Sequence, residues 1–461
     1  MKRYITTFIC ASALLFSACE KQLDIVPKGK VTLGTVDELE LLLNQEFQVS
    51  ALPYQDVCIL SGESLGAFDQ VSTILSQPNT LSFAYMTYDE AVDRATLTKS
   101  DNRYNDIYKT VNYMNTVITK IDESNGDTSR KPQIKAEAKA IRAYMHWLAA
   151  MYYARQYDPA TAADEGGIAY VTGTEVGETK TKLSLQQTYD MILSDISDEV
   201  ISLLPEKTAT PCVRGDKGWG NAVRALVLCQ MKRYAEALPY AQEAVRLHPQ
   251  MFDRSSVKES GLWTQDQLSP NNYIWIGNGS RITPTLLILS LEAVKLFEAN
   301  DYVLKYSTRG WDADWGENYS GIPGTRMFAD FTTSCNAYGP TSELMHYVAA
   351  ECLIRTGSIS EGLSLVDDVR VLRIENAQPL SAANEAEAMA LLQKAKYIEC
   401  LGTPFNFFDI KRWNSEAAYR RTVTHKLGSL GTYSLGPDSP LWVFPFPLNA
   451  RRYNPTLTNN Y

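Results

Sequence analysis

The sequence predicts a mainly α protein in which paired helices form a superhelical scaffold and one irregular segment is inserted among them. Three observations predict this. Apolar residues recur every three or four positions over long stretches, the clearest stretches are adjacent to one another, and two long segments rich in Gly, Pro, Asn, Ser and aromatic residues interrupt them. With 461 residues, 45% of them hydrophobic, the chain can bury an extensive core.

The first residues predict export. Lys2 and Arg3 precede an apolar run over 4–16, which is too short to span about 30 Å of hydrocarbon. Small residues follow and end at Cys19, so we predict a signal peptide over 1–18. The same small residues match a bacterial lipobox, in which Cys19 is acylated and 19–33 forms a lipidated tether. Several acyl chains would anchor the protein durably.

The first helix pair is expected at about 101–153. Its two apolar stripes consist of Tyr104, Ile107, Tyr108, Val111, Ile118 and Ile121, then Ile134, Ala138, Ile141, Met145, Leu148 and Tyr152. Residues at this spacing share one face of a helix, and Pro132 suits a helix start. A helical hairpin is therefore predicted.

The second and third groups are expected at about 184–249 and 341–413. Ser184 and Gln187 form a capping box that opens a helix running through Ile201 to a stop before Pro205. Further on, Ala225, Ala237, Ala244 and Pro249 are 12, 7 and 5 residues apart, which resembles a tetratricopeptide repeat (TPR). Ala350 and Gly362 repeat the spacing of 12. Small residues on facing helices permit close packing, so we expect TPR-like pairs.

The segments at about 50–100 and 250–345 are expected to be irregular and to carry the binding site. The best candidates combine aromatic rings with polar neighbours: Trp311, Trp315, Tyr302, Tyr306 and Tyr319 with Asp312 and Asn318. Flat rings stack on the apolar face of a sugar while carboxylates and amides bond its hydroxyls. Phe68 and Tyr85 form a second candidate set. For both sets the alternative is a role in the core or at a partner interface, and Tyr273 and Trp275 look like a half-buried strand.

Several function classes are disfavoured. A net charge of −9 without a basic stripe argues against nucleic acid as a partner. The acidic residues at 312–317 lack EF-hand spacing, and the cysteines after Cys19 contain no C-x-x-C pair, so neither a metal nor a cofactor is expected.

One motif favours an enzyme. Residues 62–66 read G-x-S-x-G after the strand-like Val57–Leu60, which would make Ser64 a nucleophile. That elbow requires an α/β sheet, whereas the rest of the chain reads as helix pairs. The four histidines lie on or beside predicted helices without an evident acid partner. We therefore predict that the protein is not an enzyme.

The chain resembles the SusD/RagB family over nearly its whole mature length. The resemblance rests on Cys19, on Asn115, on Glu137 with Arg142 and Tyr144, on Glu399 with 407–413 (FFDIKRW), and on the terminal pattern in 444–447 and 454–461. The chain departs from the family pattern at 403–406, and near Asp301 it lacks the usual Asp-Pro-Arg.

The resemblance implies a SusD-like, TPR-based scaffold that is anchored to the outer membrane through lipid. For function, it implies capture of a ligand without catalysis. It further implies a SusC-like TonB-dependent transporter as partner and a glycan, or in some members a peptide, as ligand. A different expectation is a pure TPR interaction scaffold whose aromatic residues are buried.

Overall fold

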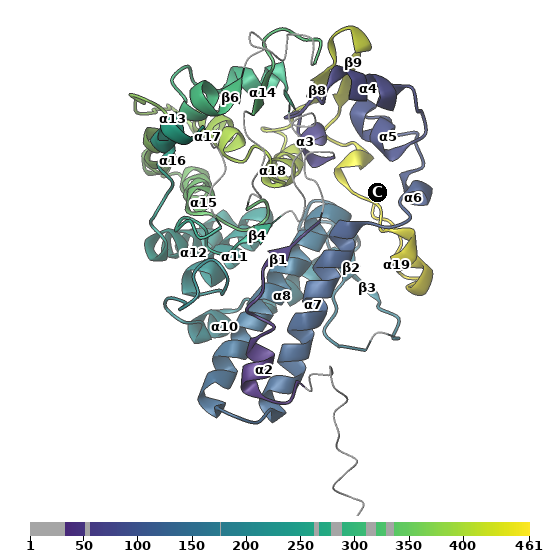
Figure 1. Ribbon diagram of the computed structural model, residues 1–461, viewed down its shortest axis with the longest axis vertical. Helices are drawn as coiled ribbons and strands as arrows, with labels where there is room; N and C mark the ends of the chain where they lie inside the picture. Colours follow the sequence, from purple (N-terminus) through teal and green to yellow (C-terminus); the bar gives the residue numbers. More distant parts are fainter. Residues whose placement is uncertain are drawn as a thin grey trace, which may run out of the picture.

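The computed structural model describes residues 33–50, 56–175, 177–261, 267–277, 288–309, 320–328 and 336–461. Helices dominate these residues, which confirms the predicted mainly α class. Figure 1 shows a long helical hairpin at the bottom, stacked helix pairs on one side, and the segment inserted between these pairs at the top. In the described part of the chain, no helix is long and apolar enough to cross a membrane.

The hairpin consists of α7 (Asn102–Lys120) and α8 (Lys131–Tyr153), within the range predicted for the first pair. The Asp101 side chain caps α7, and Pro132 lies in the first turn of α8, where a missing N–H costs nothing. Nearly all of α8 after Ile134 is buried, which makes it the central helix. The short helix α2 (Val36–Glu40) packs beside α7 near the closed end of the hairpin (Figure 1).

A small ribbon and two helices follow the hairpin. Strands β2 (Gly166–Ala169) and β3 (Lys182–Ser184) are antiparallel, and the Ser184 capping box opens α9 (Leu185–Asp195) as predicted. The helix does not continue to Ile201. It ends at Ile196, because Ser197 adopts an extended conformation and caps a separate helix, α10 (Asp198–Leu203).

The TPR-like pairs are α11 (Lys217–Gln230) with α12 (Tyr234–Leu247), and α15 (Ser342–Arg355) with α16 (Ile359–Arg373). Gly362 explains the spacing of small residues, since a Cβ there would lie 2.8 Å from the Ala350 carbonyl oxygen. The backbones of α15 and α16 therefore approach closely only because position 362 has no side chain. Helices α17 (Glu385–Glu399) and α18 (Phe405–Asn414) complete the scaffold.

The segment at 50–100 is more regular than predicted. Its described part contains four short helices: α3 (Val57–Leu60), α4 (Phe68–Leu75), α5 (Leu81–Thr87) and α6 (Arg94–Leu97). The expected strand at Val57–Leu60 is wrong, because Asp56 caps this stretch into a helical turn. Such short helices escape a search based on periodicity, which needs several turns.

The inserted segment has short elements, namely η3 (Arg254–Ser256), α13 (Val257–Ser260), β4 (Ile276–Gly277), β5 (Ile288–Leu289), α14 (Leu291–Leu296), η5 (Val303–Ser307), β6 (Thr308–Arg309) and β7 (Arg326–Phe328). Strand β7 pairs antiparallel with both β5 and β6, and β4 pairs parallel with β1 (Phe47–Gln48). Tyr273 and Trp275 do not form a half-buried strand. Both are buried, because the chain here lies inside the protein with Ile274 between them.

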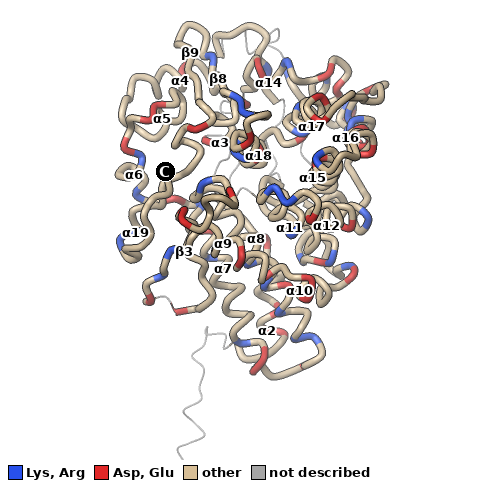
Figure 2. The backbone as a smooth tube through the Cα atoms, turned by 180° about the vertical axis from the view of Figure 1, so that it is seen from behind, with Lys and Arg blue, Asp and Glu red and all other residues tan. Residues whose placement is uncertain are grey.

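The C-terminal part returns to the hairpin through β8 (Val423–Lys426), β9 (Thr432–Leu435) and α19 (Leu448–Tyr453). Asn460 donates from Nδ2 to the carbonyl oxygens of Tyr153 and Gly167, at 2.7 and 2.8 Å. Among the described residues, five cysteines are buried and no disulfide joins them. Figure 2 shows basic and acidic residues interspersed along the backbone.

Candidate ligand-binding face

A pair of neighbouring tyrosines, one exposed and one half-buried, lies on the turn at η5. Tyr302 precedes a π-helical turn and Tyr306 lies within it, with their ring centroids 6.5 Å apart and their planes inclined by 31°. Tyr306 is 41% exposed and Tyr302 is half-buried. Single π-helical turns are rare and are found frequently at functional sites. The turn presents two neighbouring aromatic rings at the surface.

Buried polar contacts fix this turn to the scaffold. Asp301 accepts hydrogen bonds at Oδ1 from the backbone N–H groups of Val303 and Leu304, at 2.9 and 3.1 Å, and its Oδ2 lies 2.9 Å from Arg373 Nε on α16. On the other side, Arg326 of β7 donates to the carbonyl oxygens of Leu304 and Thr308. A turn held from both sides keeps its rings in place, which reduces the entropy lost on binding.

Charged side chains border the tyrosines. The Lys258 ammonium lies 4.7 Å from the centre of the Tyr302 ring, a cation–π contact, and 3.3 Å from Glu375. Lys305 lies 3.6 Å from the same carboxylate and donates to Asn300 Oδ1 at 3.0 Å. The hydrogen bond to Glu375 raises the pKa of Lys258, and the same contact lowers the pKa of Glu375. Sequence patterns missed these partners, because α13 and Glu375 are far from Tyr302 along the chain.

Phe68 packs against the end of the connection between β6 and β7. The tyrosine pair lies just before the start of that connection. Phe68 starts α4 and is half-buried, and a Cβ at Gly321 would lie 2.9 Å from its ring. Gly321 has a φ of +71°, so only glycine permits this backbone against the ring. Phe68 therefore lies beside residues 320–321, at the end of the connection. The tyrosine pair lies close to residue 309, at its start. The two ends of the connection meet in the pairing of β6 with β7.

Tyr85 belongs to the core. It is 7% exposed, its ring centre lies 5.5 Å from that of Phe444, and it belongs to α5. A ring enclosed in this way offers no face to a ligand, so we leave Tyr85 out of the candidate face. The remaining predicted site residues, Trp311, Asp312, Trp315, Asn318 and Tyr319, lie outside the described residues, as does Cys19.

The described residues of this face are suited to binding rather than to bond breaking. Two rings, two ammonium groups and a carboxylate offer stacking surfaces and hydrogen-bond partners for a polar, ring-shaped ligand. No group of three or more His, Cys, Asp and Glu side chains within the described ranges could hold a metal ion.

Comparison with known proteins identifies the fold. Residues 36–220 match the SusD-like family model described as "Starch-binding associating with outer membrane". A SusD superfamily protein from Bacteroides thetaiotaomicron has the same fold, with a TM-score of 0.73 and 17% identity over 93% of this chain and 100% of that one. The chain has the SusD-like fold. The resemblance and the SusD-like helical fold predicted from the sequence are thereby confirmed.

Two further structures share the fold of the SusD-like chain. A putative sugar binding protein from Bacteroides vulgatus superposes with a TM-score of 0.68 at 12% identity, over 94% of this chain and 99% of that one. Surface glycan-binding protein A from Bacteroides uniformis also gives 0.68, at 13% identity over 92% and 98%. Among curated protein sequences, none matches the chain.

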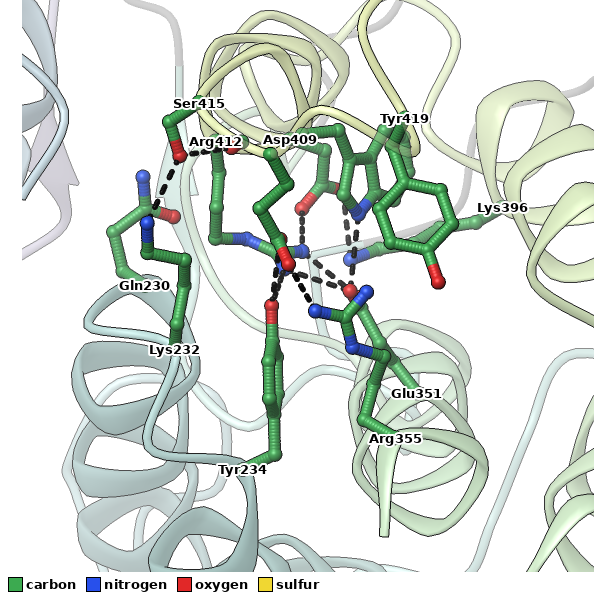
Figure 3. A network of polar contacts seen from close by, with 12 residues as sticks. Gln230, Lys232, Tyr234, Glu351, Arg355, Lys396, Asp409, Arg412, Ser415 and Tyr419 are labelled. Atoms are coloured by element: carbon green, nitrogen blue, oxygen red, sulfur yellow. Dashed lines mark hydrogen bonds and ion pairs between the residues drawn. The ribbon is translucent and has the colours of Figure 1, made fainter. Parts of the chain in front are cut away.

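The SusD-like motif at 407–413 lies inside the scaffold and not at a ligand site. Arg412 donates to both carboxylate oxygens of Glu351, at 2.7 and 2.8 Å, and to Asp409 at 3.0 Å (Figure 3). Lys396 lies 2.7 Å from the other Asp409 oxygen, and Trp413 donates from Nε1 to Glu351. Burial alone would raise the pKa of Glu351, but Arg412 overrides burial and lowers it to about 2. The network joins α15, α17 and α18.

The SusD-like motif residues of the hairpin are also structural. Arg142 donates to both oxygens of Asp195 on α9, at 2.6 and 2.8 Å, and to Asn115 Oδ1 at 2.8 Å. Asn115 in turn donates to the carbonyl oxygens of Val171 and Gly173. Glu137 accepts two hydrogen bonds from Arg214, which precedes α11. These contacts tie the hairpin to α9, to the segment at 171–173 and to the start of α11.

The geometry around Ser64 does not form a nucleophile elbow. The residue is fully buried, and it follows helix α3 instead of a sheet strand. His425 does lie nearby, but its Nε2 contacts the backbone oxygen of Ser64 at 3.0 Å, and its Nδ1 contacts the backbone oxygen of Met86. A serine hydrolase needs an accessible hydroxyl beside the imidazole, so the G-x-S-x-G match carries no catalytic role.

Proposed function

We propose that this chain is a surface lipoprotein of the outer membrane that binds glycans and delivers them to a TonB-dependent transporter. The observation that carries the proposal is the SusD-like fold along nearly the whole chain, together with a partly exposed, rigidly held tyrosine pair in its inserted segment. The matching family model is described as starch-binding and associated with the outer membrane, and two proteins of the same fold are described as a putative sugar binding protein and a surface glycan-binding protein.

The proposed site combines Tyr302, Tyr306 and Phe68 with the sequence candidates Trp311, Asp312, Trp315, Asn318 and Tyr319. Residues 310–319 connect the tyrosine turn to the segment beside Phe68. Rings at both ends of one connection suit an extended ligand with several sugar units, each stacked on a ring. A ring contact of this type contributes about 0.5–1.5 kcal/mol beyond the buried area, so several are needed for useful affinity.

The anchor is proposed to be acylated Cys19. Cys19 and Leu33 are 14 positions apart along the chain, so the tether reaches at most about 50 Å when fully extended. Helix α2, where the tether joins the fold, lies at the bottom of Figure 1, whereas α13, β6 and α14 lie at the top. The arrangement supports a membrane-proximal end and a separate ligand-binding end. Loss of fatty-acid labelling in Cys19→Ala would test the anchor.

The experiment that tests glycan binding is affinity electrophoresis of the soluble protein, truncated after Cys19, against a panel of polysaccharides, with calorimetry against the same panel and against peptides. Tyr306→Ala and Trp311→Ala should lower affinity for the retained polysaccharide by roughly 2- to 12-fold each. The matched control is Tyr453→Ala, a tyrosine that is 69% exposed on α19 and should not alter retention.

Each result has a defined meaning. Retention that both ring variants weaken and the control preserves supports glycan capture at this face. Binding of peptides but of no polysaccharide would replace the glycan by a peptide ligand. Retention that neither ring variant changes would remove the proposed face, and the absence of any binding would favour an interaction scaffold.

A further inference from the structure

A cavity lies inward from the tyrosine turn. It has a volume of about 100 Å³ and lies where the inserted segment packs on the first turn of α15, the end of α16 and the junction of α17 with α18. The elements that carry the candidate face also line it, since Val303 follows Tyr302 and Arg254 belongs to η3, directly before α13. About 10–15 Å³ is enough for one water molecule, so the cavity has room for several waters or for one small polar molecule.

Most of the charged side chains that line the cavity form ion pairs with one another or with adjacent residues. Arg254 and Arg373 both contact Glu399, at 2.6 and 3.0 Å, and Arg373 is also held by Asp301. Glu343 accepts hydrogen bonds from Asn271 Nδ2 and, at 2.7 Å, from the Phe252 backbone. Burial and the neighbouring Glu399 raise the pKa of Glu343. A charged ligand would disturb this balance of charge, whereas a neutral one would not.

One buried acceptor in the lining is unused. Asn271 is 1% exposed, and among the described residues its Oδ1 has no hydrogen-bond partner. An unsatisfied buried polar atom costs about 1–3 kcal/mol, so such atoms normally face a ligand or water. Trp275 is also part of the lining and supplies an indole to the same space. An indole, an open acceptor and ion pairs already satisfied by each other are suited to a polyhydroxylated ring.

From this combination, we infer that the cavity is a second subsite that takes a single neutral sugar unit, with a hydroxyl donating to Asn271 Oδ1. The inference rests on the proposed glycan-binding function and refines it. The outer face holds the chain of a neutral glycan and the cavity holds one unit of it. Glycans built wholly from uronic acids, or from amino sugars with a free ammonium group, are excluded from the cavity by its charge balance.

Two variants test the inference without touching the outer face. Leu344→Phe, on α15, fills part of the cavity without removing a polar group, and Asn271→Ala removes the open acceptor. The probes are the methyl glycosides of glucose, galactose, mannose and xylose, with glucuronate and glucosamine as charged counterparts, each titrated by calorimetry. Tyr306→Ala serves as the control that alters the outer face alone.

We expect wild type to bind at least one neutral glycoside and to bind both charged sugars at least tenfold more weakly. Each cavity variant should lower neutral glycoside affinity about tenfold, whereas Tyr306→Ala should weaken the long polysaccharide more than the glycoside. Circular dichroism identifies a variant that fails to fold, in which case the other variant decides.

The two proposals fail in different ways. If wild type retains a polysaccharide but both cavity variants bind the glycosides as wild type does, or if no neutral glycoside binds, the cavity subsite is overturned and glycan capture stands. Equal binding of glucuronate and glucoside would overturn the neutral preference and with it the inference. If wild type retains no polysaccharide and no sugar, both proposals fall.

Discussion

The helical scaffold and the inserted segment both contain ion pairs between basic and acidic side chains, but several pairs of the scaffold are buried, whereas the pairs beside the tyrosines of the inserted segment are exposed. In the scaffold, Arg412, Arg142 and Arg214 are buried, and each forms a two-pronged contact with a carboxylate from another helix. In the inserted segment, Lys258 and Lys305 are exposed and share Glu375 beside an open tyrosine pair. Buried pairs are costly to break, whereas exposed ones are easily exchanged for ligand contacts. Stability should therefore depend on the first region and recognition on the second.

The largest loss of stability is expected from Arg412→Ala. It leaves Glu351 buried without its bidentate partner, so the free energy of unfolding should fall by about 3–5 kcal/mol, measured by urea denaturation. Arg246→Ala is the matched control, because its pair with Glu243 is exposed, and it should leave the denaturation midpoint unchanged. A loss below about 1 kcal/mol for Arg412→Ala would show that the network does not govern stability.

A smaller loss is expected from Asn115→Ala. The change leaves Val171 and Gly173 carbonyl oxygens and one Arg142 nitrogen without their partner, which should lower the free energy of unfolding by about 1–3 kcal/mol. Asn112→Ala, exposed on the same helix, is the control and should have little effect. Similar losses in the two variants would mean that the amide contacts contribute little beyond helix propensity.

Acid should weaken the scaffold through His146. Its Nδ1–H donates to the Arg142 carbonyl oxygen and its Nε2 accepts from the Val171 N–H, so the neutral ring is fully bonded. Burial lowers the pKa of His146 to about 3, whereas an unfolded histidine titrates near 6.5. Between these values only the unfolded state holds the proton. Stability from this group is complete above pH 6.5 and falls as pH drops, by at most about 1.4 kcal/mol per pH unit.

The pH profile of the unfolding free energy, measured for wild type and His146→Gln, checks this. The variant should lose less stability than wild type between pH 6.5 and 4.5, because it has no proton to take up. Parallel profiles would show that His146 is not the group responsible. Glu63 works in the opposite direction, since burial raises its pKa to about 7, and a difference between two variants of one protein cancels its contribution.

The smallest effect on stability is expected from Tyr306→Ala. The ring is 41% exposed, so its removal should change the free energy of unfolding by no more than about 0.5 kcal/mol, although it weakens ligand binding. Urea denaturation and the binding assay, carried out on the same variant, show whether this region affects binding without affecting stability. A loss of several kcal/mol would place the tyrosine turn within the stability core.

The sequence predicted the long helices well because burial along a helix repeats every three or four residues. Ser184 was found as a cap and Gly362 as a close-packing position from local patterns alone. The partners of Arg412 could not be found in this way, because Glu351 is 61 residues away and only the folded chain brings them together. Tyr306 was named as a candidate because aromatic residues stand out in a polar segment, and its role in binding stays a prediction. Lys258 and Asn271 were missed, because a single lysine or asparagine gives no pattern.

Lys411 joins distant parts of the chain, with a consequence for how such proteins diversify. From α18 it donates to the carbonyl oxygens of Met151 and Ala154 at the end of α8, 260 and 257 residues earlier in the chain. The Lys411 and Asn460 contacts join the hairpin directly to the C-terminal part of the chain. Residues 250–345 take no part in them. Mutation can therefore remodel the inserted segment while this framework still folds, so the proposed binding face can vary on one inherited architecture.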